Sequence, residues 1–256
     1  MLGRKFIVAA VACLLPVFAQ AAGGGGGYIE SVHLQPDNKA SLQRGARTYV
    51  NYCIGCHSLG YLRYNRMAND LGLPADIVED NLIFTSNADG SPHKVTDMMD
   101  SAMSTEYAKG AFGVAPPDLS LTARSRGVDW LYTYLKTFYV DESRTTTGHN
   151  NMAFPDVGMP NVLWELQGLQ KAVFTTHSDE EGNETEVFEG FEQITEGQLS
   201  AREYDKVIRD LVNFLHYAAE PGRAQRISMG IWVMLFLFVF TAGAYVLKKE
   251  WWRDVR

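Results

Sequence analysis

The sequence predicts a mainly α-helical body that is exported across a membrane and held there by one C-terminal transmembrane helix. Two observations carry this expectation: an apolar block stands at each end of the chain, and several stretches between them have apolar residues at helical spacing. The 256 residues are 46% hydrophobic and 21% charged, as in an ordinary globular protein, and they are enough to bury a sizeable core.

Residues 1–21 are expected to be a cleaved secretory signal peptide. Two basic residues precede an apolar stretch from Phe6 to Ala19, which leads into an Ala-Gln-Ala cleavage pattern. As a helix this stretch of about 14 residues would reach only ~21 Å, which is short of the ~30 Å hydrocarbon core of a bilayer. Cys13 lies inside the segment, so the mature chain keeps two of the three cysteines.

Residues 227–247 are expected to form the transmembrane helix. They contain no charged residue, and 21 residues span about 31 Å as an α-helix. Four basic residues follow this stretch, and only two arginines stand just before it. The excess of positive charge on the cytoplasmic side of a span then predicts a periplasmic body, residues 22–226, and a cytoplasmic tail, residues 248–256. The short export signal is typical of a Gram-negative bacterium rather than of a mitochondrial presequence. The chain is therefore expected to cross the inner membrane once, through residues 227–247.

The exported body is strongly acidic. Residues 1–21 carry two basic residues, and the segment from Ile227 onward carries four basic and two acidic ones, so removing both lowers the formal charge from −7 to −11. Such a charge argues against nucleic acid as a partner and favours cationic partners or plain solubility.

Three helices and one hairpin are expected before the last helix of the body. Apolar positions from Ser41 to Cys53 recur at helical spacing, and Val95–Gly110 also reads as a helix that ends at a glycine. Residues 127–140 are a further candidate helix, although their aromatic content leaves a strand open. Residues 171–191 read as two strands joined by an acidic turn that contains glycine.

The last helix of the body has a clear start and a clear stop. Ser200 is placed to cap it, and Glu203 to reach back to the capping residue. The helical pattern then continues to Pro221 and Gly222, which end it before the membrane span.

The motif Cys53-Ile-Gly-Cys56-His57 is the strongest chemical signal in the chain. A zinc ribbon would usually need a second Cys-x-x-Cys, and a thioredoxin-like dithiol expects a strand before the cysteines, where the pattern here is helical. A c-type haem needs two thiols for its vinyl groups and an adjacent imidazole for its iron. Residues i, i+3 and i+4 share one face of a helical turn, so the three side chains can address one porphyrin. We therefore expect one covalently attached haem c.

An electron-transfer haem needs a second iron ligand, which is commonly methionine. Met159 is favoured because it lies between Pro155 and Pro160, which stiffen its loop. Met152 is the next candidate. The remaining candidates are Met67, Met98, Met99, Met103, His93, His149 and His177, of which Met98, Met99 and Met103 are expected to fill the core.

Several segments together resemble the cytochrome c1 family, whose members are the haem subunits of the cytochrome bc1 complex (ubiquinol–cytochrome c reductase). They are RGARTYVNYCIGCHSLGYLRY, APPDLS followed by RSRG, FPDVGMP, and AEPGRAQRISMG, which leads into a single C-terminal span. The resemblance covers essentially the whole mature chain. It implies a cytochrome-c-like haem domain with insertions, mainly α-helical, plus the C-terminal transmembrane helix.

The resemblance also implies roles for individual residues. Cys53 and Cys56 match the thioether cysteines of the family, His57 its proximal iron ligand and Met159 its distal iron ligand.

Two further residues match positions that touch the haem in the family. Pro117 matches the proline packed beside the haem on the histidine side, and Arg126 resembles the arginine that meets a haem propionate. Trp130 stands where the family often has tyrosine, and the sequence GMPNV departs from the common Met-x-Pro-Pro continuation of the distal loop.

The function implied is electron transfer without bond-breaking chemistry, so the chain is not expected to be an enzyme by itself. It would accept single electrons from a Rieske-type iron–sulfur protein, next to cytochrome b, and pass them to a soluble or membrane-bound c-type cytochrome. Two alternatives stay open: a free-standing membrane-tethered electron shuttle, and a haem peroxidase or gas sensor with an open iron position. The acidic run 179–192 is either a docking patch for a basic electron carrier or a solvated hairpin tip.

Overall fold

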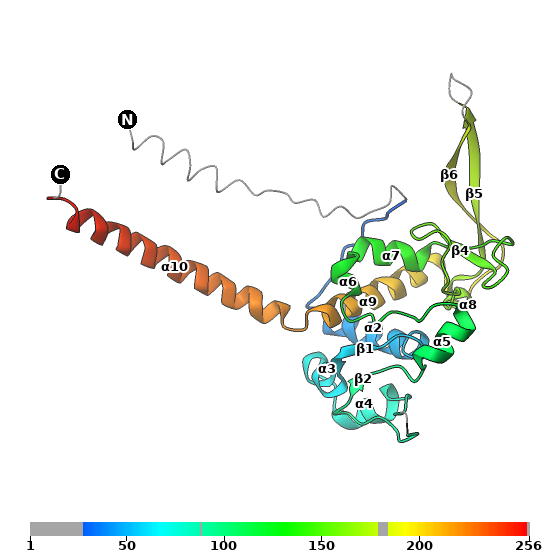
Figure 1. The fold of residues 1–256 in the computed structure, drawn as a ribbon, viewed down its shortest axis with the longest axis horizontal. Helices are drawn as coiled ribbons and strands as arrows, with labels where there is room; N and C mark the ends of the chain where they lie inside the picture. Colours follow the sequence, from blue (N-terminus) through cyan, green and yellow to red (C-terminus); the bar gives the residue numbers. More distant parts are fainter. Residues whose placement is uncertain (1–27, 88, 179–183, 255–256) are drawn as a thin grey trace.

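A computed structural model describes residues 28–87, 89–178 and 184–254 of the chain. The expected signal peptide, residues 1–21, and the tip of the acidic run lie outside the described residues. The described part consists of a mainly helical body, a long hairpin that projects from it and a long helix that leaves it at the C-terminal end (Figure 1).

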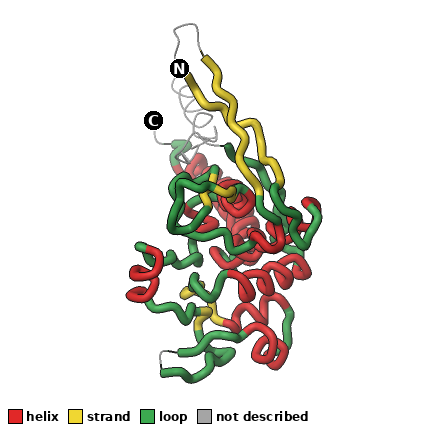
Figure 2. The backbone as a smooth tube through the Cα atoms, turned by 90° about the vertical axis from the view of Figure 1, so that its right-hand side faces the viewer, coloured by secondary structure: helices red, strands yellow, loops and turns green. Residues whose placement is uncertain are grey.

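The helices in the described residues, in chain order, are α2 (Lys39–Tyr52), α3 (Tyr64–Leu71), α4 (Ala75–Leu82), α5 (Thr105–Phe112), α6 (Thr122–Ser125), α7 (Val128–Lys136), α8 (Trp164–Gln167), α9 (Ala201–Ala219) and α10 (Arg223–Trp251). The strands form antiparallel pairs, which are β1 (Leu59–Arg63) with β2 (Met98–Met99), β3 (Phe138–Val140) with β4 (His149–Asn151), and β5 (Gln170–Ser178) with β6 (Glu184–Gln193). Helices dominate the body, the β5–β6 hairpin projects from it, and the two short strand pairs lie among the helices (Figure 2).

The pair formed by α2 and α9 makes the centre of the core. The Asn38 side chain caps α2 by accepting a hydrogen bond from the Ser41 backbone N–H at 3.1 Å. Ser200 and Glu203 form a complete capping box at the start of α9. Apolar side chains of both helices are fully buried against each other, among them Ala46, Tyr49, Ile208, Leu211 and Phe214.

The two helices touch at Gly45, where no side chain separates their backbones. A β-carbon at this position would lie 2.1 Å from the Asp210 backbone oxygen and 2.6 Å from Cβ of Phe214. Beside this contact the Asp210 carboxylate accepts hydrogen bonds from the Ser41 hydroxyl at 2.6 Å and from Nε of Arg44 at 2.6 Å. The buried carboxylate is therefore paired, as burial of a charge requires.

The structure confirms most of the expected elements. The helix over 41–53 is α2, the hairpin over 171–191 is β5 and β6, and the capped last helix of the body is α9, which ends at Ala219 just before Pro221. Residues 127–140 contain both of the forms that the sequence left open, since α7 is followed by β3.

The helix expected over Val95–Gly110 is wrong in its first half. Met98 and Met99 form β2 and pair with β1, and the helix α5 begins only at Thr105, where the Ser104 side chain caps it. The reason is tertiary: Met99 is fully buried and its extended backbone pairs with Leu59 of β1, so this pairing and burial override the local helical pattern. Met99 fills the core, as expected.

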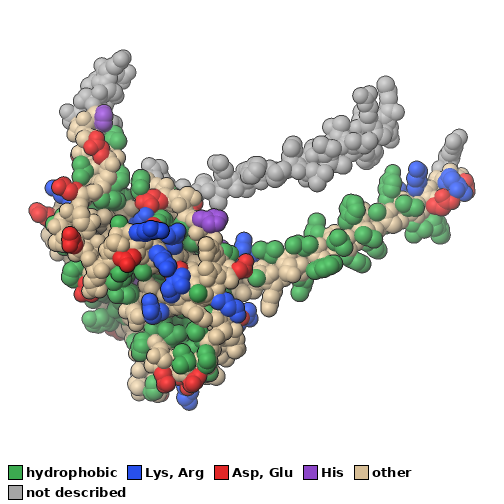
Figure 3. Space-filling view, turned by 180° about the vertical axis from the view of Figure 1, so that it is seen from behind, with side chains coloured by type: hydrophobic (Ala, Val, Ile, Leu, Met, Phe, Trp, Pro, Cys, Tyr) green, Lys and Arg blue, Asp and Glu red, His purple; other side chains and the backbone are tan. Residues whose placement is uncertain are grey.

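Helix α10 contains the expected span, residues 227–247. It is long and apolar enough to cross a membrane, and the body buries none of its residues. Hydrophobic side chains cover its length and charged ones gather at its far end (Figure 3). Trp232 and Phe238 are 70% and 78% exposed, which fits a helix whose side chains are solvated by lipid rather than by water.

Gly45→Ala is expected to destabilise the body. The added methyl group would overlap the α9 backbone, and overpacking of this kind typically costs about 1–3 kcal/mol. The measurement is urea unfolding followed by circular dichroism, in which Gly45→Ala should lower the midpoint.

Gly110→Ala is the matched control, because Gly110 also lies in a helix but a β-carbon there meets no atom within 4 Å. This variant should be neutral or slightly stabilising, since alanine favours a helix by up to about 1 kcal/mol over glycine. Equal midpoints for both variants would contradict the close contact of α2 and α9.

Candidate functional site

A cavity of about 540 Å³ lies in the body where the end of α2 meets α7, α9 and the loop after β4. Most of its lining is apolar. All six site residues expected from the sequence line it, namely Cys53, Cys56, His57, Pro117, Arg126 and Met159. Two side chains of α9, Leu211 and Leu215, also contribute, so the helix that forms the core also forms part of the cavity wall.

The cysteine motif forms a helical turn at the end of α2. The last helical residue is Tyr52, and the backbone N–H groups of Cys56 and His57 then donate to the Cys53 carbonyl at 3.0 and 2.8 Å. The hydroxyl of the fully buried Tyr49 donates a hydrogen bond to the His57 carbonyl at 2.5 Å and so ties the end of the turn to α2. This arrangement places the i, i+3 and i+4 side chains on the same cavity.

Both thiols of the motif are free and are poor nucleophiles as they stand. Burial raises the pKa of the Cys53 thiol to about 12 and raises that of Cys56 above its usual value. A dithiol exchange site needs a thiolate near neutral pH, so these pKa values disfavour that interpretation. In the described part of the chain no group of three or more His, Cys, Asp or Glu side chains is arranged to hold a metal ion.

His57 has a defined tautomer. Its Nδ1 lies 2.7 Å from the Pro117 carbonyl oxygen, and because a carbonyl can only accept, Nδ1 carries the hydrogen. Burial lowers the pKa of His57, which keeps the ring neutral. Nε2 is then left with a free lone pair, which is the form of histidine that binds a metal.

The Pro117 carbonyl is held in place by the residues that follow it. The Asp118 carboxylate accepts from the Gly60 and Ser120 backbone N–H groups at 2.8 and 2.7 Å, and the Leu119 N–H donates to the Ser58 carbonyl at 2.9 Å. These hydrogen bonds fasten the APPDLS segment to β1 and to Ser58, which follow the cysteine motif in the chain. Pro117 therefore contributes to the site through its carbonyl, which accepts from His57, as well as through its ring, which lines the cavity.

Met159 lies in a loop whose shape depends on more than its prolines. Asp156 has a left-handed backbone with φ of 61°, and its carboxylate accepts from Nη1 of Arg144 at 2.8 Å. Nη2 of the same arginine donates to the Val157 carbonyl at 3.3 Å. Arg144 therefore clamps the turn that precedes the methionine.

Two buried asparagines at the end of β4 fix the start of this loop. Asn151 accepts at Oδ1 from the backbone N–H groups of Ala153 and Phe154, at 2.9 and 3.1 Å. Asn150 accepts at Oδ1 from the Asp156 N–H at 2.8 Å. Neither residue was expected from the sequence, where the only signal is an Asn-Asn pair just before the proline-containing loop.

Met159 also has a hydrogen-bond partner that the sequence did not indicate. The Tyr134 hydroxyl donates to Sδ of Met159 at 3.3 Å, and both side chains line the cavity. Burial raises the pKa of Tyr134, so its hydroxyl stays protonated and remains a donor.

Arg126 stands at the cavity with two aromatic rings and no carboxylate. Its guanidinium carbon lies 5.2 Å from the ring centroid of Trp130 and 5.9 Å from that of Phe154. Among the described residues no ion pair involves Arg126, although the side chain is exposed. Trp130 lines the same cavity. The charge of Arg126 is thus available for an anion bound there.

The rival iron ligands considered from the sequence do not line the cavity. Met67 and Met99 are fully buried in the core, and His93 is bonded to the Thr85 hydroxyl at 2.9 Å. The remaining rivals that are absent from the lining are Met98, Met103, Met152, His149 and His177.

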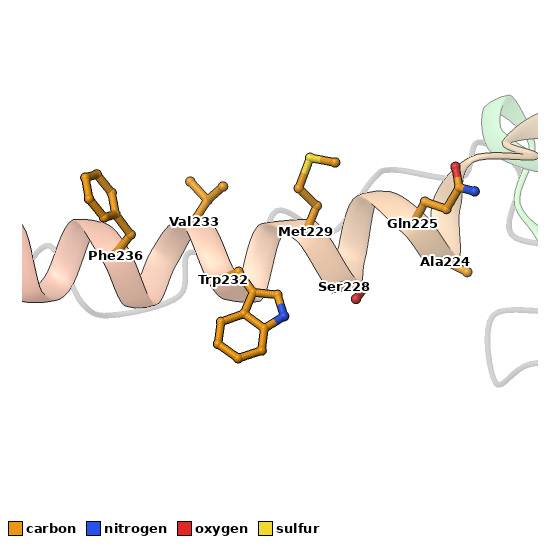
Figure 4. A pocket seen from close by; sticks show the side chains of 7 residues that line it. All are labelled: Ala224, Gln225, Ser228, Met229, Trp232, Val233 and Phe236. Atoms are coloured by element: carbon orange, nitrogen blue, oxygen red, sulfur yellow. The ribbon is translucent and has the colours of Figure 1, made fainter.

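A second hollow runs along the first turns of α10, but it carries no chemistry. Its lining side chains, among them Met229, Trp232 and Phe236, all belong to this one helix (Figure 4). They are apolar apart from Gln225 and Ser228. We therefore assign the functional site to the cavity at the end of α2, which brings sulfur and imidazole groups together.

The residues of the cavity fit a haem c. Two thiols spaced by two residues, a neutral imidazole with Nε2 free and a thioether sulfur on the same apolar cavity are the groups that such a cofactor requires. A volume of about 540 Å³ lies within the usual range for cofactor sites.

Comparison with known proteins gives a consistent result over nearly the whole chain. The profile of the Cytochrome C1 family matches residues 30–255. A protein named cytochrome c1 from Allochromatium vinosum is 48% identical over 252 residues, which cover 98% of this chain and 99% of that protein. A protein named ammonia monooxygenase gamma subunit from Nitrosomonas europaea is 41% identical over 251 residues, 98% of each chain. A cytochrome c1 from Rhodospirillum rubrum is 27% identical over 246 residues, 86% of this chain and 83% of that protein.

Proposed function

Because this chain belongs to the cytochrome c1 family, the haem-bearing electron-transfer subunits of the cytochrome bc1 complex, we propose that it receives single electrons from a Rieske-type iron–sulfur protein and passes them to a c-type cytochrome. Members of this family carry one covalently attached haem c and are not themselves catalytic. They function in the complex together with cytochrome b and a Rieske protein.

The cofactor is proposed to be attached covalently through Cys53 and Cys56. Its iron would be bound by His57 and by Met159. When bound, the haem supplies a one-electron couple between ferric and ferrous iron. The cysteines would hold its vinyl carbons as thioethers, and Nε2 of His57 would ligate the iron. The observation that carries this proposal is the bond from Nδ1 of His57 to the Pro117 carbonyl, which directs the free lone pair of Nε2 away from the backbone.

Arg126 is proposed to pair with a propionate of the cofactor. Its guanidinium lies over the rings of Trp130 and Phe154, which leaves its hydrogen-bond donors free for a carboxylate. Trp130 supports this arrangement through the face of its ring, over which the guanidinium lies, rather than through a phenol hydroxyl of the kind that the family often has at its position.

Met159 decides between electron transfer and the alternative of a peroxidase or gas sensor. A thioether that closes the second iron position excludes oxygen and peroxide and favours a high potential. The asparagines and Arg144 hold its loop in one form, so the ligand would stay in place in both oxidation states.

The haem domain, residues 22–226, is proposed to lie in the periplasm, with residues 227–247 crossing the inner membrane and residues 248–256 in the cytoplasm. The support is the apolar surface of α10 and the basic residues Lys248 and Lys249 in its last turn. Membrane anchoring itself is a property of bacterial cytochromes c1.

A chain that ends at Arg226 should be exported, acquire haem and remain soluble. Every residue assigned to the cavity precedes Pro221, and α10 contributes no buried residue. The measurement is the visible spectrum and the haem content of the periplasmic fraction. Loss of haem or of a low-spin spectrum in this truncated chain would contradict the separation of anchor and redox site.

Met159→Leu should keep the covalent haem but lower its reduction potential. Leucine is close to methionine in volume, so repacking should cost less than about 1.5 kcal/mol, and the cysteine motif is untouched. The iron would lose its thioether ligand, and a harder ligand such as water would stabilise the ferric state. A redox titration, carbon monoxide binding by the reduced protein and loss of the weak red band of sulfur-ligated ferric haem measure the effect.

Met152→Leu is the matched control, since Met152 lies in the same loop region but does not line the cavity. It should retain the potential, the red band and the resistance to carbon monoxide. If the two variants exchanged these properties, the assignment of the distal ligand would be wrong, while the haem assignment would stand.

Electron transfer to a basic acceptor should slow as salt concentration rises, because the body carries a formal charge of −11. Replacing all seven acidic residues of 179–192 by their amides reduces the formal charge of the body from −11 to −4, but should weaken this dependence by less than the lost share of the charge. The hairpin projects from the body (Figure 1) and its nine-residue strand is ~30 Å long, whereas the screening length is ~8 Å at physiological ionic strength. A slope that falls nearly to zero in this variant would instead identify the hairpin as the docking patch.

A further inference from the structure

Tyr134 occupies a position toward Met159 that the proposed electron transfer does not by itself require. Its hydroxyl donates a hydrogen bond to Sδ of the methionine at 3.3 Å. The sulfur of a thioether carries no hydrogen, so the phenol must be the donor and one sulfur lone pair must accept. Sulfur has two lone pairs, and this bond leaves the other one free.

The phenol ring of Tyr134 is held between two aromatic neighbours. It stacks on Trp130 with ring centroids 5.0 Å apart and an interplanar angle of 14°, and it meets Phe138 edge-on at 5.1 Å. Stacked and edge-to-face contacts are the geometries that aromatic pairs prefer, so the two together favour this orientation of the ring. The position of the hydroxyl is therefore set by α7 and β3 and does not depend on Met159.

The sulfur is tied to the same framework through Asn151. Nδ2 of this buried asparagine donates to the Tyr134 carbonyl at 2.7 Å, while its Oδ1 accepts from the Ala153 and Phe154 N–H groups at 2.9 and 3.1 Å. One side chain thus joins the backbone of α7 to the beginning of the loop that carries Met159. The spacing between phenol and thioether is consequently built into the fold.

We propose that Tyr134 is a positioning residue for Met159 that fixes which lone pair of the sulfur faces the cavity and thereby raises the reduction potential of the site. This inference rests on the proposed role of Met159 as an iron ligand. The physical reason is that a hydrogen bond withdraws electron density from the sulfur. Weaker electron donation from the sulfur removes more stabilisation from the ferric ion, which is the more positive one, than from the ferrous ion. Reduction therefore becomes more favourable.

Tyr134→Phe in the full-length chain, in its membrane complex, tests this directly. The substitution keeps the ring and its stacking and removes only the donor. We expect an equilibrium constant for reduction that is about 3- to 10-fold lower, where tenfold corresponds to about 59 mV for one electron. The red band of the sulfur-ligated ferric protein should persist but shift or weaken, because the ligand is retained with a less restricted orientation.

Tyr132→Phe is the matched control. Tyr132 lies on the same helix, and its hydroxyl is bonded to the Asp205 carboxylate and to Nζ of Lys136 instead of to the methionine. Both variants lose a hydrogen bond and should unfold at lower urea concentration, whereas only Tyr134→Phe should change the potential. A potential that is unchanged in Tyr134→Phe, or lowered equally in both variants, would overturn the inference.

The double variant Met159→Leu with Tyr134→Phe separates this inference from the proposed function. If the tyrosine acts through the sulfur, its removal should add no further change to the potential of Met159→Leu. If Met159→Leu alone leaves the red band and the potential unchanged, the ligand assignment fails. If Met159→Leu behaves as expected and Tyr134→Phe does not, only the role of Tyr134 fails.

Discussion

The contact of α2 with α9 at Gly45 positions the cysteine motif relative to one wall of the cavity. A β-carbon there would overlap the Asp210 backbone, so the two helix axes approach more closely than side chains would permit. The end of α2 carries the cysteine motif, and α9 contributes Leu211 and Leu215 to the cavity wall. A shift of either helix would therefore move the thiols and the imidazole relative to the apolar wall that faces them.

The histidine side and the methionine side of the cavity are supported by independent networks. His57 depends on the Pro117 carbonyl, which Asp118 and its backbone partners fasten to β1. Met159 depends on Asn150, Asn151 and Arg144, which fix the loop after β4. In both networks most of the bonds join a side chain to backbone atoms, and the Arg144–Asp156 pair is an exposed exception. A surface ion pair of this kind contributes little by itself. Electron transfer requires little rearrangement at the iron, and this construction suits that requirement.

The sequence predicted the elements whose signals are local. The capping pair Ser200 and Glu203 identified α9, and the spacing of the cysteine motif predicted a turn that the structure confirms. The prediction of a helix over Val95–Gly110 was wrong in its first half, because Met99 is extended and pairs with β1, a contact that periodicity does not encode. Tyr134 and Asn151 were missed for the same reason. Each acts on a residue 17 to 25 positions away, and neither residue type signals such a role in a sequence.

The connection between cavity and membrane runs through the last turn of α9. Glu220 follows this helix, and its carboxylate pairs with Nε of Arg226 in α10 at 2.5 Å and with Nη1 of Arg124 in α6 at 3.7 Å. The bond to Arg226 lowers the pKa of Glu220, so the carboxylate stays ionised at neutral pH. Both arginines are exposed, so the pairs add little stability. Through Glu220 these pairs connect the start of α10 to α6, which contributes Thr122 and Ser125 to the cavity lining. The break between α9 and α10 at Pro221 and Gly222 sets where the anchor leaves the body, and we expect the chemistry of the cavity to be independent of the anchor.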